Sequence, residues 1–141
     1  MNYVIDTNIV TGIIKNDEKV KRKMQELSFC GKEVFINGIS YYETKRGLLA
    51  VNATGKLAIF DQICKILRIL FLGNKRIFDR ASQIYADLKQ RGELIKDADI
   101  LIAAMALTTN LILVSDDTDF QRIGGLTLEN WLESNNEGQS L

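Results

Sequence analysis

Short runs of consecutive apolar residues recur along the chain, separated by longer segments with helical spacing. Three runs are rich in β-branched and aromatic residues and are bounded by polar ones: residues 3–5, 34–36 and 111–114. Such runs are typical of the buried strands of a parallel sheet. A further apolar run at residues 69–71 is a candidate strand. The pattern therefore predicts three strands and a possible fourth.

The segments between these runs carry apolar residues at the spacing of one helix face. Asp6-Thr7-Asn8 can cap a helix after the first strand, and Ser40 opens a helix with Glu43 in the capping-box arrangement. Residues 98–107 predict a central buried helix. Three further apolar stripes predict helices: Val20, Met24 and Leu27; Leu57, Phe60, Cys64 and Leu67; and Ile77, Ala81, Ile84, Tyr85 and Leu88. The second and third of these predict a helical hairpin, with the candidate strand in the connection between its two helices.

Strands alternating with helices in this order predict an α/β fold with a small parallel sheet covered on both faces. In such sheets the functional crevice lies beyond the carboxyl ends of the strands. The length of 141 residues suits one domain, which we expect over residues 1–133. The polar residues 134–141 are expected to form a flexible tail.

The composition excludes several classes of protein. Eighteen basic and eighteen acidic residues cancel, so no bulk positive field draws the molecule to nucleic acid or to a membrane. The longest apolar run, residues 100–107, is far shorter than the ~20 residues that cross a bilayer. Cys30 and Cys64 follow no metal-ligand spacing and no secretory signal precedes them. We expect reduced thiols in a soluble, cytoplasmic protein.

The chain contains no histidine. This excludes Ser-His-Asp and Cys-His catalysis, histidine acid–base chemistry, and zinc sites that need imidazole. Any enzymatic chemistry must then be carried by carboxylates or lysines.

Carboxylates from four separate segments are predicted to lie at one edge of the sheet. Asp6 and Asp117 follow the first and last strands, and Glu43 lies near the start of the helix after the second strand. Asp99 lies in the first turn of the apolar helix. An ionised carboxylate on a buried helix is costly unless it is paired or binds a cation. Asp99 is therefore the acid that a structural role explains least well.

The other acids also have structural explanations. Asp6 can be a helix cap, and Glu43 a capping-box partner. Asp116, Asp117 and Asp119 can be turn or cap residues. Taken together, however, like charges at one edge raise one another's pKa unless a positive charge neutralises them. Because no lysine or arginine lies within a few residues of Asp6 or Asp117, the pattern favours a divalent cation, Mg²⁺ or Mn²⁺.

Four ordered fragments resemble the PIN domain family, in particular the VapC-like toxins of bacterial toxin–antitoxin pairs. They are VIDTN at residues 4–8, ISYYE at 39–43, DADILIAAMA at 97–106 and LVSDDTDFQRIGGL at 113–126. The resemblance implies a three-layer α/β/α sandwich and a metal-dependent endoribonuclease that cleaves RNA. It also implies a homodimer that is neutralised by a cognate antitoxin protein.

By position, the resemblance assigns the catalytic and metal-binding acids to Asp6, Glu43, Asp99 and Asp117. It places Thr7, Asn8 and Ser115 beside the metal. Asp119 is expected to cap the short turn through Arg122 or to orient the metal ligands, and Asp116 is expected to point to solvent. The extra acid in Ser115-Asp116-Asp117 leaves the fourth ligand open among Asp116, Asp117 and Asp119.

Two other functions fit parts of the pattern. A phosphatase with an acidic nucleophile needs a second acid two positions after the first, where this chain has Asn8. A catalytically inert PIN-like module would use the same fold to bind RNA or protein. The neutral net charge leaves RNA contacts to local basic residues, of which the candidates are Lys15, Lys19, Lys21, Arg22, Lys23, Lys45 and Arg46.

Overall fold

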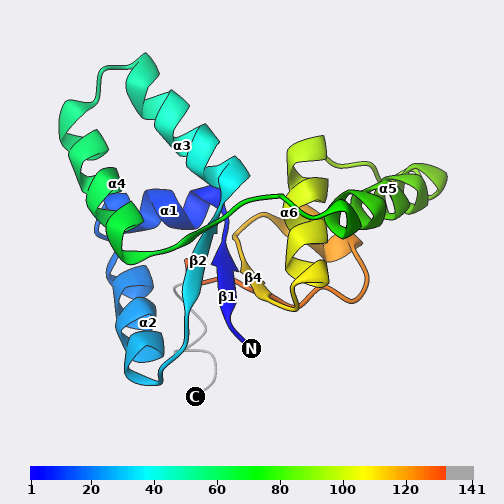
Figure 1. Ribbon diagram of the computed structural model, residues 1–141, viewed down its shortest axis with the longest axis horizontal. Coiled ribbons are helices and arrows are strands. Elements are labelled where there is room, and N and C mark those ends of the chain that lie inside the picture. Colours follow the sequence, from blue (N-terminus) through cyan, green and yellow to red (C-terminus); the bar gives the residue numbers. More distant parts are fainter. Residues whose placement is uncertain (133–141) are drawn as a thin grey trace.

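The computed structural model describes residues 1–132, so the tail expected at 134–141 lies outside the described residues. Strands and helices alternate along the chain (Figure 1). The elements are β1 (Tyr3–Ile5), α1 (Thr7–Ile14), α2 (Glu18–Phe29), β2 (Val34–Asn37), α3 (Gly38–Ala50), α4 (Thr54–Ile66), β3 (Ile69–Leu70), α5 (Lys75–Gln90), α6 (Asp97–Thr108), β4 (Ile112–Val114), the 3₁₀ helix η1 (Thr118–Arg122) and β5 (Leu128–Glu129).

The strands form a parallel sheet in the order β3-β2-β1-β4-β5. β1 is central, and its Val4 lies opposite Phe35 of β2 and Leu113 of β4. The parallel sheet, the three strands and the candidate strand at 69–71 are confirmed. The sequence pattern does not predict β5, because its two residues, Leu128 and Glu129, form no apolar run of their own.

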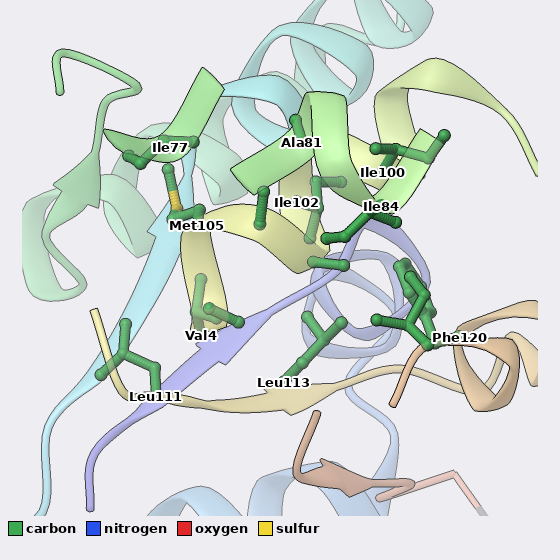
Figure 2. Packing of buried hydrophobic residues seen from close by; sticks show 14 of the residues in the cluster. Val4, Ile77, Ala81, Ile84, Ile100, Ile102, Met105, Leu111, Leu113 and Phe120 are labelled. Carbon is green, nitrogen blue, oxygen red and sulfur yellow. The ribbon is translucent and has the colours of Figure 1, made fainter. Parts of the chain in front are cut away.

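Successive side chains of each strand point to opposite faces of the sheet, and helices cover both. Val4, Phe35 and Leu113 belong to one apolar cluster, which α5 and α6 complete (Figure 2). Ile5 and Ile36 belong to a second cluster, with residues from α1, α2 and α4. The predicted three-layer α/β/α arrangement is confirmed.

The predicted helical hairpin is wrong. α4 and α5 lie on opposite sides of the sheet (Figure 1), and β3 between them pairs in parallel with β2. Phe60 of α4 packs in one cluster and Ile84 of α5 in the other. Two apolar stripes can cover each other or pack on other elements. Here the stripe of α4 packs on one side of the sheet, whereas the stripe of α5 packs on α6, which covers the other side.

Helix α6 is buried on almost every side, as its apolar sequence predicts. Ile102 and Met105 are at most 1% exposed, and α5 packs over the side of α6 that faces away from the sheet (Figure 2). Asp99 lies in the first turn of this helix. Among the described residues, no helix combines the length and the apolar character of a membrane span.

Candidate metal centre

Asp6 directly follows the central strand and is 5% exposed. Its backbone N–H continues the ladder by donating to the carbonyl of Val114 at 2.9 Å. Its Oδ1 accepts a hydrogen bond from the backbone N–H of Thr7 at 2.8 Å, which caps α1. Asp6 is therefore a helix cap, and the same contact fixes its carboxylate at the carboxyl edge of the sheet.

The second oxygen of Asp6 joins the first strand to the fourth. Oδ2 accepts from the hydroxyl of Ser115 at 2.8 Å and from the side-chain amide of Asn8 at 3.3 Å. The same amide also donates to Ser115 Oγ at 3.2 Å. Burial raises the pKa of Asp6, while the hydrogen bonds from Ser115 and Thr7 oppose that rise. These donors fix the orientation of the buried carboxyl group.

Glu43 is not part of a capping box, so that prediction is wrong. The cap of α3 is Asn37, whose Oδ1 accepts from the backbone N–H of Ser40 at 2.8 Å. Asn37 is fully buried and also donates to the carbonyl of Ile5 at 3.1 Å. Because the cap of α3 lies three residues before Ser40, the expected cap, Glu43 is free of the helix end. Its Oε1 instead accepts from Thr7 Oγ1 at 2.7 Å.

Thr7 thus connects two of the predicted acids. Its backbone N–H donates to Asp6, and its hydroxyl donates to Glu43 and lies 3.0 Å from Ser40 Oγ. Two segments that are far apart in sequence meet at this point: the junction between β1 and α1, and the first turns of α3.

Three other acids gather on the α6 side of the same edge. One carboxylate oxygen from each of Asp99, Asp117 and Asp119 lies within 4.8 Å of the others. Asp117 also caps η1 by accepting from the backbone N–H of Asp119 at 2.9 Å. Asp119 forms the expected contact with Arg122, at 3.4 Å. The sequence favours a supporting role for Asp119 and leaves it open as the fourth ligand, and its place two residues after Asp117 in a tight turn indicates the proximity.

The pKa of Asp99 is raised to about 6. Burial is the largest cause, and the charges of Asp6, Asp117 and Glu43 add to it, against a smaller lowering effect of Lys96. Asp6 and Glu43 lie outside the 4.8 Å group, yet both repel Asp99. The four predicted acids therefore share one electrostatic environment.

Asp116, the extra acid of the loop, is exposed, as expected. Its backbone N–H donates to Asn8 Oδ1 at 3.3 Å, so the loop is anchored while the side chain is left at the surface. The neighbouring Asp117 donates its backbone N–H to Ser115 Oγ at 3.1 Å. The register of the loop thus turns Asp117 toward Asp99 and Asp116 away.

This set of donors fits a divalent cation. Carboxylate oxygens are the hard ligands that Mg²⁺ and Mn²⁺ prefer. A dication among these groups would remove the repulsion that raises the pKa of Asp99. Asp119 has Arg122 as an ion-pair partner, whereas within residues 1–132 no lysine or arginine forms an ion pair with Asp6, Glu43, Asp99 or Asp117.

Comparison with known proteins identifies one family over most of the chain. A family model described as the PIN domain matches residues 3–126. The chain is 32% identical over 136 residues to Ribonuclease VapC2 of Haemophilus influenzae, covering 94% of this chain and 99% of that protein. It is 27% identical to the tRNA(fMet)-specific endonuclease VapC of Shigella flexneri, covering 93% of this chain and 98% of that protein.

A solved structure agrees with the fold. The crystal structure of VapBC2 from Rickettsia felis bound to a DNA fragment from their promoter matches with a TM-score of 0.82 and 28% identity. The match covers 93% of this chain and 99% of that chain. The similarity therefore extends over nearly the whole of both chains.

Proposed function

Because the chain belongs to the PIN domain family, we propose that it is a metal-dependent endoribonuclease acting as the toxin of a toxin–antitoxin pair. The observation that carries the proposal is the gathering of acids from separate segments at one edge of the sheet, where carboxylate oxygens of Asp99, Asp117 and Asp119 lie within 4.8 Å of one another. The raised pKa of Asp99, caused by burial and by the neighbouring acids, supports it. A structural role does not require such mutual repulsion, whereas a cation site does. The similarity to proteins named ribonucleases over nearly the whole length supports the reaction class.

In this proposal, Asp6, Glu43, Asp99 and Asp117 hold Mg²⁺ or Mn²⁺, and Asp119 adds a fifth carboxylate beside Asp99 and Asp117. When bound, the ion supplies a water of lowered pKa and neutralises negative charge that develops on the phosphodiester. The carboxylates need no proton of their own for this chemistry, which fits a chain without histidine.

The remaining polar residues keep the acids in position. Ser115 and Asn8 orient Asp6 through its Oδ2, and Thr7 holds Glu43. Residues that orient metal ligands typically affect metal affinity or activity by about 10–100-fold when they are removed. Ser115 also connects Asp6 to the loop that carries Asp117, because its Oγ accepts a hydrogen bond from the backbone N–H of Asp117.

The proposed partners are an RNA substrate, a cognate antitoxin and a second copy of the chain, in the cytoplasm. The VapBC complex from Rickettsia felis supports the antitoxin, since it resembles this chain over nearly its full length. The name of the Shigella relative makes tRNA a suitable first substrate to test.

The test compares Asp99→Asn with Asp97→Asn, a matched change in the first turn of the same helix. Asp97 is exposed and lies outside the group of three acids. Purified proteins are incubated with total tRNA and a labelled single-stranded RNA in Mg²⁺, Mn²⁺ or EDTA. We expect metal-dependent cleavage by the wild type and by Asp97→Asn, and a loss of about 100-fold in Asp99→Asn.

Equal cleavage by Asp99→Asn, or cleavage that persists in EDTA, would overturn the metal-dependent mechanism. Calorimetric titration with Mn²⁺ separates the inert alternative: a folded wild type that neither binds the ion nor cleaves RNA is a binding module.

A further inference from the structure

A cavity adjoins the metal centre on the side of α1, α3 and α4. Its volume is about 210 Å³, and Thr7 and Glu43 form part of its wall. These two residues also belong to the metal centre, where they are joined by the 2.7 Å hydrogen bond. α1, α3 and α4 lie together on one side of the sheet (Figure 1). A ligand in the cavity would therefore lie next to a metal ion held by the acids.

The cavity wall carries two lysines without partners. Lys15 follows α1 and Lys56 lies in the first turn of α4, and both line the cavity. Within residues 1–132, neither forms an ion pair or a side-chain hydrogen bond. Against these two positive charges stands one carboxylate, Glu43, which already accepts from Thr7. The wall therefore has an excess of positive charge.

A buried hydroxyl in the same wall also lacks a partner. Thr44 is 7% exposed, and its Oγ1 is the unpaired buried side-chain oxygen or nitrogen among the described residues. Leaving such a group unpaired costs about 1–3 kcal/mol. A hydroxyl and two ammonium groups are all donors, so together they complement a ligand with several acceptor oxygens.

The rest of the wall consists of the apolar side chains of Ile14 and Leu48, with Gly47 and Thr11, whose hydroxyl already donates to the carbonyl of Thr7. A nucleotide combines a phosphate, which suits the lysines, with a sugar and base whose faces suit an apolar wall. We propose that this cavity, the Lys15–Lys56 pocket, binds the nucleotide next to the cleaved bond of the RNA. The inference rests on the proposed nuclease function, and it explains how a chain of zero net charge holds RNA locally.

The first test measures binding without cleavage. A fluorescein-labelled single-stranded RNA is titrated by anisotropy in EDTA, at several salt concentrations, with the wild type and the double variant Lys15→Gln/Lys56→Gln. The matched control is Lys32→Gln/Lys89→Gln, which removes two exposed lysines outside the cavity. We expect roughly tenfold weaker binding for the pocket variant than for the control.

The salt dependence gives a sharper signature. Each phosphate contact on a single strand contributes about 0.7 to the slope of log affinity against log salt, so the pocket variant should lose roughly 0.7 or more. Thr44→Val should weaken binding too, while its stability equals or exceeds that of the wild type, because an unpaired hydroxyl is replaced by a methyl group of similar size. In Mg²⁺, the lysine variant should raise KM and leave kcat near the wild-type value.

The outcomes are distinguishable. A wild type that cleaves RNA, with pocket and control variants of equal affinity and slope, overturns the pocket and leaves the nuclease standing. A wild type that neither cleaves nor binds RNA overturns the proposed function itself. A labelled oligoglutamate peptide is titrated in the same way. If the pocket variant loses binding of this peptide while its RNA binding is unchanged, the pocket takes an acidic protein segment, and the nucleotide proposal is wrong.

Discussion

Replacing Asp99 by asparagine should stabilise the protein in the absence of metal. The Asp99 carboxyl is partly buried beside Asp6, Glu43 and Asp117, and its pKa is raised to about 6. At pH 7.5 it is nevertheless ionised, so the folded state carries a charge that its surroundings disfavour. Asparagine has nearly the same shape and no charge.

The magnitude follows from the shift in pKa. A rise from 3.8 to about 6 corresponds to at most about 3 kcal/mol. Asp99 is only partly buried, and solvent screening reduces the expected effect to about 1–2 kcal/mol. The folded pKa lies above the unfolded value, so the penalty is zero well below the unfolded pKa of 3.8, grows as the pH rises toward 6, and is complete above it.

The assay is urea denaturation in EDTA at pH 7.5 and near pH 4, with Asp97→Asn as the control. Asp99→Asn should exceed the wild type by about 1–2 kcal/mol at pH 7.5, and the difference should shrink near pH 4. Saturating Mn²⁺ should stabilise the wild type more than the variant, because binding to the folded state adds stability. An Asp99→Asn variant no more stable than the wild type at pH 7.5 in EDTA would refute the electrostatic argument.

Three further outcomes are expected. Asn37→Ala should lower the free energy of unfolding by about 2–3 kcal/mol in urea denaturation, since it removes the cap of α3 and the buried hydrogen bonds from the Asn37 amide to the carbonyl of Ile5 and the hydroxyl of Ser40. Ser115→Ala should shift the acidic limb of the pH–rate profile upward, because the lost hydrogen bond raises the pKa of Asp6 further; an unchanged limb would contradict this. Arg122→Gln should weaken Mn²⁺ binding in calorimetry by a few-fold, since Arg122 pairs with Asp119 and donates to the carbonyls of residues 93 and 94, whereas unchanged affinity would show that the contact is only structural.

The sequence predicts the edge of the sheet where the acids meet better than it predicts their hydrogen bonds. Asp6 and Asp117 follow apolar strands, and the rule on carboxyl ends places both correctly. Asn37 is harder, because an Asn-Gly pair after a strand indicates a turn, whereas here the buried amide begins a helix. The partner of Glu43 follows from that start and so is also missed.

Tertiary packing explains the other points at which the structure differs from what the sequence predicts. The two stripes on α4 and α5 have the same spacing whether they cover each other or opposite faces of a sheet, so periodicity alone could not separate these arrangements. Likewise the approach of Asp119 to Asp99 depends on how η1 packs against α6, which is a contact between segments about twenty residues apart.

The central position of β1 has a consequence for synthesis on the ribosome. β1 is made first, but one of its two neighbours is β4, which begins at Ile112. A nascent or truncated chain that ends before β4 has no Ser115 to hold Asp6 and no Asp117 beside Asp99. The proposed metal centre can therefore assemble only after β4 and the loop that follows it have been made, because these segments supply Ser115 and Asp117.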